Sequence, residues 1–207
     1  MARYTKSVCK QCRRERMKLF LKGAKCETMK CPVERKPYPP GEHGRGRIRE
    51  SEYLLQLREK QKARRIYGVL EKQFRNLYQQ ASRQDGITGE NLLRMLEQRI
   101  DNVVYRTNFA ASRNQARQLV RHGHVLVNGK RVTIPSYQVR EGAVLALGPK
   151  AKNNIVIRHN VDTVDRAIPA WLDVSSERLE ATVRGAPMRE QIDVPVREQL
   201  IVELYSK

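Results

Sequence analysis

The spacing of hydrophobic positions is most regular between residues 96 and 106. Leu96, Ile100, Val103 and Val104 recur at the three- and four-residue steps that place side chains on one face of an α-helix. The polar residues between them face the other way. This stretch therefore predicts one amphipathic helix that packs on a hydrophobic core.

A second, shorter helix is predicted over residues 113–121. Ser112 is a favourable N-cap, and Gly123 is a natural residue to end the helix. Between them, Ala116, Leu119 and Val120 form a short hydrophobic stripe. The basic residues of this helix must therefore point away from the core.

Alternating hydrophobic and polar residues predict β-structure after this helix. VLVNGKRV, residues 125–132, alternates around Asn128-Gly129, the strongest short signal for a two-residue type I′ turn. Residues 136–148 and 154–160 are further strand candidates, and residues 171–183 predict another hairpin. The final segment has Val196, Leu200 and Leu204 at four-residue steps, which favours a helix, although residues 200–202 also suit a strand.

Three helices are predicted before residue 96. Ser51 is a good N-cap for the first, and a stripe that begins at Phe74 and Leu77 marks the second, over residues 70–84. Thr88 caps the third, which continues toward Leu96. Short links between helices of this length indicate a small helical domain.

The charge of the chain points to a polyanionic partner. The 207 residues include 41 Lys and Arg against 22 Asp and Glu, a formal net charge of +19. The first 150 residues hold 33 of these basic residues and 13 acidic ones, whereas the last 57 hold eight and nine. No hydrophobic run approaches the ~20 residues of a membrane span, and no signal-peptide core follows Met1, so we expect a soluble, intracellular protein that binds nucleic acid.

All four cysteines lie near the N-terminus, as Cys9, Cys12, Cys26 and Cys31. Two close pairs separated by about a dozen residues are typical of one tetrahedral metal site, with zinc as the expected ion and an iron–sulfur cluster as the alternative. Two disulfides or four unrelated thiols are the other interpretations. We expect the nearby cations to lower the thiol pKa values and so to favour ligation.

Residues 35–49, RKPYPPGEHGRGRIR, form either a flexible linker or an extended basic arm. The prolines favour extended backbone, and the glycines allow turns. An arm would place Arg and Lys on phosphates and let Tyr38 or His43 stack on an unpaired RNA base. We favour the arm.

Basic side chains at helical spacing suggest an RNA-binding face. Arg113, Arg117 and Arg121 lie four residues apart, so they form one ridge, and no acidic residue occurs between residues 110 and 139. A solvated face is the commoner role of such ridges. The candidate RNA contacts are Arg3, Tyr4, Lys10, Arg13, Arg14, Lys18, Lys22, Arg35, Lys36, Tyr38, His43, Arg45, Arg47, Arg49, Lys60, Lys62, Arg64, Arg65, Ser112, Arg113, Gln115, Arg117, Arg121, His122, Asn128, Lys130 and Arg131.

These patterns predict an α+β fold in three parts. Residues 1–49 form the N-terminal metal-bound knuckle and basic arm, and residues 50–95 form a helical domain. Residues 96–194 form an RNA-binding module of two helices and a small, mainly antiparallel sheet. Its helix-helix-hairpin part covers residues 96–160, and a β extension follows.

The stretch RIDNVVYRTNFAASRNQARQLVRHGHVLVNGKRV resembles a small RNA-binding module found in ribosomal, RNA-modifying and tRNA-charging proteins. The N-terminal MARY, the four cysteines, RKPYPPGEHGRGR, LREKQKARRIYG, QFRNLY and PVREQLIVELYSK extend the resemblance along essentially the whole chain. Together they resemble the bacterial-type small-subunit ribosomal protein S4 family, in its metal-binding subset. The resemblance implies that the module is inserted into the helical domain, and that about residues 195–207 pack on those helices and complete the domain.

The resemblance also implies a function. Family members bind the 5′ domain of small-subunit (16S) ribosomal RNA early and nucleate assembly, and they contribute to translational accuracy. They contact ribosomal protein S5 and the region where mRNA enters, and some repress translation of their own operon. We expect a cytoplasmic ribosome, with an organellar ribosome as the alternative location.

We do not expect an enzyme. Residues 151–207 are too short for the catalytic domain of a pseudouridine synthase, and no nucleotide-binding fingerprint or Cys-His nucleophile arrangement is present. Asp101 and Asp162 are interpreted as helix-surface and turn residues. A zinc-dependent nucleic-acid-binding regulator is the alternative function, although no recognition helix with zinc-finger spacing follows the cysteines.

Overall fold

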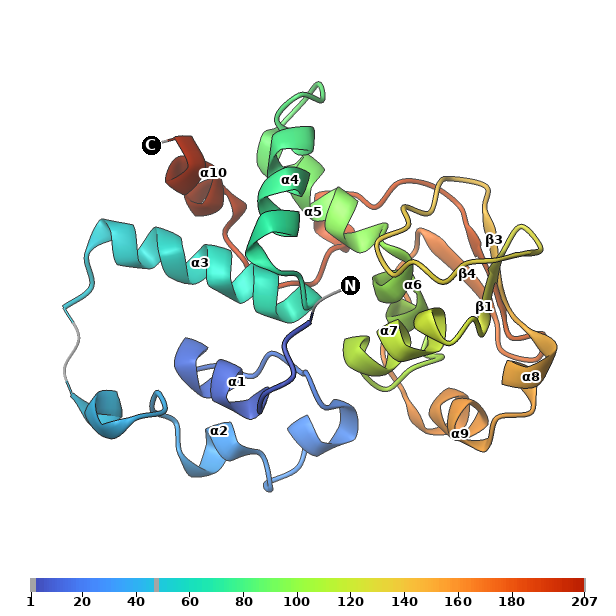
Figure 1. Cartoon of the computed structure of the whole chain (residues 1–207), viewed down its shortest axis with the longest axis horizontal. Coiled ribbons are helices and arrows are strands. Elements are labelled where there is room, and N and C mark those ends of the chain that lie inside the picture. The colour runs from blue at the N-terminus through green and yellow to red at the C-terminus, as the bar shows by residue number, and fades with distance from the viewer. Residues whose placement is uncertain (1–2, 47–48, 207) are drawn as a thin grey trace. The chain divides into compact units, whose positions relative to one another are not determined.

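The computed structural model describes residues 3–46 and 49–206. In this part of the chain, ten α-helices and one five-stranded antiparallel sheet confirm the α+β class (Figure 1). The chain divides into two compact units, Met1–Leu92 with Val194–Lys207, and Leu93–Asp193. We call them unit 1 and unit 2; the predicted boundary at residue 49 falls inside unit 1. No helix among the described residues is both long and hydrophobic enough to cross a membrane.

The N-terminal part of unit 1 contains short helical turns, where the sequence predicts irregular structure. Helices α1 (Cys9–Glu15) and α2 (Pro32–Arg35) alternate with 3-10 turns η1 (Gly23–Cys26) and η2 (Glu42–Arg45). Arg16 adopts a left-handed conformation that ends α1, and Pro32 opens α2. These turns are too short to show hydrophobic periodicity, so the prediction for this segment is wrong in part.

The remaining helices of unit 1 agree with the hydrophobic pattern. They are α3 (Glu52–Tyr67), α4 (Glu71–Ala81), the start of α5 (Thr88–Glu97) and α10 (Glu198–Ser206). The Ser51 hydroxyl accepts a hydrogen bond from the Leu54 amide at 3.3 Å, which confirms the predicted N-cap of α3.

The C-terminal segment is helical, and it packs on α3. Ile201 is fully buried, and Gln56 on α3 donates to the Glu203 carboxylate at 2.9 Å. The Tyr205 ring stacks on Tyr78 of α4 with centroids 4.5 Å apart. Residues 194–207 therefore complete the core of unit 1, and the prediction of a C-terminal helix is confirmed.

The helix predicted through residues 96–104 is interrupted. Helix α5 ends at Glu97, and α6 (Ile100–Arg106) begins after an extended Arg99. The Ile100 amide donates to the Tyr137 carbonyl, and the Val139 amide donates to the Gln98 carbonyl, both at 2.9 Å. These bonds to residues 137–139 replace helical bonds at the break. Spacing alone cannot detect this, because both helices keep the same buried face.

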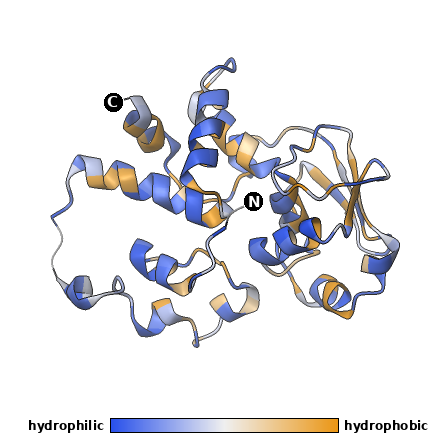
Figure 2. Cartoon of the chain, viewed as in Figure 1, coloured by the Kyte–Doolittle hydropathy of each residue, from blue (hydrophilic) through white to orange (hydrophobic). Residues whose placement is uncertain are grey.

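Unit 2 is completed by α7 (Arg113–Arg121), the sheet and two further helices. The strands are β1 (Val125–Val127), β2 (Lys130–Arg131), β3 (Val144–Leu147), β4 (Leu172–Ser175) and β5 (Glu180–Val183), in the order β2-β1-β3-β5-β4. All neighbouring strands are antiparallel. Hydrophobic residues predominate in β1 and β3 (Figure 2), whereas β2 consists of two exposed cations, and most buried strand residues share one core with α6 and α7. Both predicted hairpins are confirmed.

Two predicted strands differ from the structure. Residues 154–160 belong mainly to a helix, α9 (Ile155–Thr163), which follows the short helix α8 (Pro149–Lys152). The Asn154 side chain accepts from the Val156 amide at 2.9 Å, and Ile157 and Asn160 are buried at three-residue spacing. The other is the strand predicted over residues 136–148, of which only the part after the turn at Glu141-Gly142 forms a strand, β3. Between residue 136 and that turn, only Gln138 has a β pairing among the described residues, a single bridge to Arg99. A short hydrophobic run fits both the helical and the strand periodicity, and the hydrogen bond to the Asn154 side chain favours the helix.

The docking of α10 can be tested by truncating its buried side chain. Replacing Ile201 by Ala should lower the free energy of unfolding by roughly 2–5 kcal/mol, because the change leaves a cavity in the core. Replacing the half-buried Val202 by Ala on the same helix should cost less. Urea unfolding curves measure both values, and equal effects would contradict the observed orientation of α10.

Candidate nucleic-acid interface and cysteine cluster

The four cysteines come together in unit 1. They line one cavity of about 10 Å³, together with hydrophobic residues that include Val8, Leu21 and Val33. Cys9 and Cys12 lie on α1, Cys26 ends η1, and Cys31 precedes α2. All four are free thiols, and three of them are buried. A cavity of this size has room for about one small ion or water.

The pKa values of the Cys12 and Cys26 thiols shift in the direction opposite to the one expected. Burial raises the pKa of Cys12 to about 11, and repulsion from the other three cysteines adds to that shift. Burial also raises the pKa of Cys26, while the Lys22 amide, 3.3 Å from its sulfur, opposes the shift. The surrounding cations are mostly exposed, so they do not compensate for the lost hydration of a thiolate.

The arrangement does not itself establish a metal site. Among the described residues, no group of three or more His, Cys, Asp or Glu side chains is placed so that it could hold a metal ion. The four thiols share a cavity, and soft sulfur donors around one small space suit zinc or iron. Ligation would require the thiols to move closer together around that cavity.

The start of α7 is built by two residues predicted to contact RNA. The Ser112 hydroxyl accepts from the Gln115 amide at 3.3 Å, and the Gln115 side chain accepts from the Ala111 amide at 2.7 Å. This arrangement fixes the direction in which the helix begins. Both side chains therefore have a structural role within unit 2.

The three arginines of α7 do not form one exposed ridge, and this prediction is wrong for Arg117. Its side chain is only 4% exposed, and it donates to the Asp101 carboxylate at 3.2 Å. Arg99 donates to the two oxygens of the same carboxylate at 3.1 and 2.8 Å. Burial lowers the pKa of the Arg117 guanidinium, and Asp101 opposes that shift. Asp101 itself is buried, so its interpretation as a surface residue is also wrong.

A second polar cluster holds α6 against α7. The buried Glu97 carboxylate accepts from Asn102 at 2.7 Å and from Arg106 at 2.9 Å. Arg113 donates to the Asn102 side chain at 2.8 Å, and its guanidinium lies 4.2 Å from the Tyr105 ring centre. Sequence reasoning missed these partners, although polar residues within the hydrophobic run IDNVVY are a signal for them.

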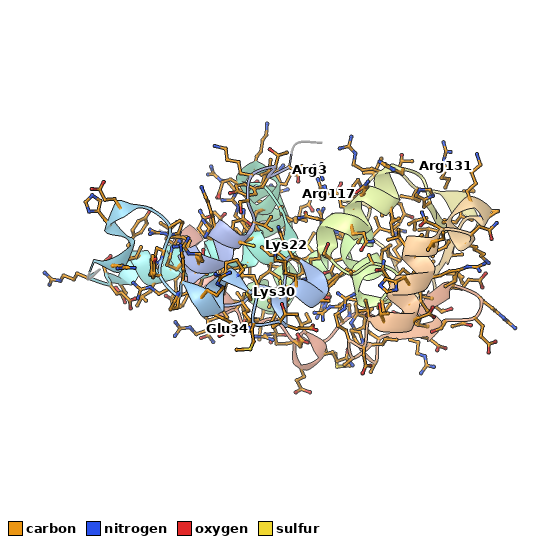
Figure 3. All side chains as sticks on the ribbon, turned by 90° about the horizontal axis from the view of Figure 1, so that it is seen from below. Arg3, Lys22, Lys30, Glu34, Arg117 and Arg131 are labelled. Carbon is orange, nitrogen blue, oxygen red and sulfur yellow. The ribbon has the colours of Figure 1, made fainter. Side chains whose placement is uncertain are left out.

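The exposed cations of unit 2 that are predicted to contact RNA lie at the end of α7 and on the hairpin. Asn128 and Gly129 have φ angles of 48° and 76°, which confirms the type I′ turn. Lys130 and Arg131 are exposed on the edge strand β2, and Arg131 projects from the ribbon in Figure 3. Gly123 is constrained here, because a Cβ atom would lie 2.9 Å from Cδ of Arg131.

Two histidines lie beside these cations. His122 is exposed at the end of α7, and His124 is half-buried. Their ring centres are 6.1 Å apart. The position of His122 is compatible with its predicted contact to RNA, which stays a prediction.

The basic run at the end of α3 is paired within unit 1. Lys60 and Arg64 contact the Glu71 carboxylate at 3.0 and 2.5 Å, and Lys62 contacts Glu59 at 2.5 Å. Arg65 pairs with Glu15, whose carboxyl pKa is raised by burial. Ion pairing fixes these four side chains, so phosphate contact would have to compete with it.

The predicted contacts before residue 50 are mostly exposed. Lys18 is half-buried and pairs with Glu34 at 2.6 Å, and Arg13 and Tyr38 contact each other. Arg47 lies outside the described residues. The exposed residues of this group are Arg3, Tyr4, Lys10, Arg14, Lys22, Arg35, Lys36, His43, Arg45 and Arg49.

Comparison with known proteins matches both units. Residues 3–97 match the family described as "Ribosomal protein S4/S9 N-terminal domain", and residues 98–145 match the S4 domain. The chain is 64% identical to the small ribosomal subunit protein uS4 of Acidothermus cellulolyticus, over the full length of both. It is 59% identical to the uS4 proteins of Frankia casuarinae and Pelotomaculum thermopropionicum, again over both full lengths.

The chain belongs to the uS4 family. The predicted family resemblance is thereby confirmed. uS4 proteins are structural ribosomal proteins and not enzymes, so the prediction that this chain is no enzyme is confirmed through its family. Membership in a metal-binding subset of uS4 stays a prediction.

The buried carboxylate between Arg99 and Arg117 can be tested directly. Replacing Asp101 by Asn should lower the free energy of unfolding by roughly 3–5 kcal/mol, because two guanidinium groups then stay buried without an anion. Replacing the exposed Asp162 by Asn is the matched control and should change it by less than about 0.5 kcal/mol. Denaturant titration of both variants gives the comparison, and equal stabilities would refute the role of Asp101.

Proposed function

We propose that this chain is a structural constituent of the small ribosomal subunit and binds its ribosomal RNA mainly through phosphates. Family membership supports the assignment, and the exposed cations at the end of α7 and on the hairpin carry the mechanism. Arg121, Lys130 and Arg131 are exposed, and among the described residues none of them has an ion-pair partner. The cations at the end of α3, by contrast, form ion pairs with carboxylates.

The shape of this surface suits a folded RNA. The deep, narrow groove of A-form RNA hides the base edges, so a rigid basic surface recognises backbone geometry at a junction. The type I′ turn fixes the backbone of the hairpin that carries Lys130 and Arg131 before binding. Preorganised contacts of this kind lose little conformational entropy when the complex forms.

The family supports more specific roles as proposals. We infer that the chain binds the 5′ domain of 16S ribosomal RNA, nucleates assembly of the small subunit and contributes to translational accuracy. Its proposed partners are ribosomal protein S5 and mRNA where it enters the ribosome, and translational repression of its own operon is a further proposed role. These roles require a location on the ribosome in the cytoplasm.

We also propose one zinc ion at Cys9, Cys12, Cys26 and Cys31, with an iron–sulfur cluster as the alternative. The shared cavity supports the site, because four thiols surround a space of single-ion size. A bound cation would lower the pKa values that burial raises and would join α1, η1 and α2. The hydrophobic residues of this segment alone form only a small core.

RNA binding can be tested by competition. The protein should bind a ribosomal RNA junction in preference to duplex DNA of equal length, and its affinity should fall steeply with salt concentration. Replacing Arg121 or Lys130 by Gln should reduce the slope of the log–log salt plot by about one each. Filter binding or fluorescence anisotropy at several salt concentrations measures this slope.

Arg178 provides the control, because it is an exposed arginine of unit 2 outside the candidate contacts. Its replacement by Gln should leave the slope unchanged. Equal affinity for both nucleic acids would contradict the proposal and favour a nucleic-acid-binding regulator.

The metal can be tested by elemental analysis of full-length protein purified without oxygen. About one zinc per chain is expected, and Cys26→Ser should lose the ion because one of four ligands is removed. Iron with acid-labile sulfide would identify the cluster instead. A metal-free protein whose residues 9–35 are protected from proteolysis would refute the site.

A further inference from the structure

Arg13 of α1 is directed into residues 36–46 of the basic arm. Its Nε atom donates to the carbonyl oxygens of Lys36 and Tyr38 at 3.2 and 3.0 Å, and its Nη2 atom lies 3.5 Å from the Pro39 carbonyl. One guanidinium therefore contacts three carbonyls that lie close together in the sequence. A lysine could not reproduce this fork of donors.

The ring of Tyr38 is held between two guanidinium groups. The Cζ atom of Arg13 lies 4.9 Å from the ring centre, and that of Arg45 lies 4.8 Å from it. Arg45 also donates to the Tyr38 hydroxyl at 3.4 Å, and this bond lowers the pKa of the phenol. Cation–π contacts on the ring compete with the predicted stacking of Tyr38 on an RNA base.

The backbone of the arm is closely folded. A Cβ atom at Gly44 would lie 2.0 Å from the Pro39 carbonyl oxygen, so only glycine fits there. The Gly44 amide donates to the Gly41 carbonyl at 3.2 Å, and the Gly46 amide donates to the His43 carbonyl at 3.1 Å. The arm is thus a defined loop and differs from both a flexible linker and a fully extended segment.

We propose that Arg13 is a positioning residue, which holds the arm as a preformed RNA-binding loop and does not itself contact phosphate. The inference rests on the proposed function, because it concerns how the same protein binds RNA. The exposed cations Lys36 and Arg45 and the exposed His43 are the groups that the loop presents. Arg13 follows Cys12 directly, so it connects the cysteine cluster to this loop.

Arg13 favours binding because it orders the loop beforehand, so the loop loses less conformational entropy when RNA binds. Without Arg13, the segment before Gly41 loses three carbonyl contacts and one cation–π contact, and binding would then have to order it. Affinity should fall, whereas the number of phosphates contacted in the final complex should stay the same. The salt dependence of binding separates these two quantities.

The test compares Arg13→Lys, Arg13→Ala and Arg14→Ala in the full-length protein with a ribosomal RNA junction. Arg13→Lys and Arg13→Ala should each weaken binding about tenfold, with an unchanged log–log salt slope. Arg14 is the matched control, because it is exposed on the same helix and is a candidate phosphate contact. Its replacement should reduce the slope by about one.

A second measurement does not require RNA. Hydrogen exchange at the Gly44 and Gly46 amides should be at least tenfold faster in Arg13→Lys than in the unchanged protein, because the loop opens more often. Tyr38→Leu removes the ring and should accelerate the same amides while Arg13 is kept. If the Arg13 variants fail to fold, exchange in Tyr38→Leu provides the test of the loop contacts.

Each outcome decides the proposal. Unchanged exchange in either variant, unchanged affinity of Arg13→Lys, or a salt slope lowered by one in Arg13→Ala would overturn the positioning role. If the unchanged protein fails to bind the RNA, the proposed function fails, and the exchange data still decide whether Arg13 organises the loop.

Discussion

Unit 2 depends on the ion pairs that the buried Asp101 carboxylate forms. This carboxylate accepts hydrogen bonds from Arg99, at the break between α5 and α6, and from Arg117, on α7. An isolated charge in this environment would be strongly destabilising, so the three groups must be buried together or not at all. The cluster fixes the angle at which α7 leaves the core and thereby the direction of its exposed end.

Pairing within the protein divides the basic residues into two classes. On α3 the cations are matched by carboxylates such as Glu71 and Glu59, and they stabilise the helical packing. At the end of α7 and on the hairpin, Arg121 and Arg131 have no such partner among the described residues. The formal net charge of +19 therefore does not mean that the whole surface attracts RNA, because part of the positive charge is paired with carboxylates. What matters for binding is where the unpaired cations lie.

Sequence patterns predicted the helices and hairpins of this chain where one face is buried. They failed where a local contact overrides periodicity: at Arg99, which pairs with residues of a later loop, and at residues 154–160, where the Asn154 cap selects a helix. Helical spacing placed Arg117 with Arg113 and Arg121, but it could not show that α6 supplies a buried acid. The cysteine spacing predicted that the four cysteines form one cluster. It could not predict that the pKa values of Cys12 and Cys26 are raised, because burial causes this shift and the spacing of residues does not show which side chains are buried.

The packing of α10 on α3 has a consequence for biosynthesis. Unit 1 is discontinuous, and Ile201 and Tyr205 supply part of its core from the last residues of the chain. Unit 2 is continuous and precedes that helix in the sequence, so all of its residues are synthesised before α10. Until α10 has been synthesised, the helices of unit 1 lack one of the elements that cover their core. The N-terminal half of this chain is therefore synthesised first, but its core needs residues that are synthesised after unit 2.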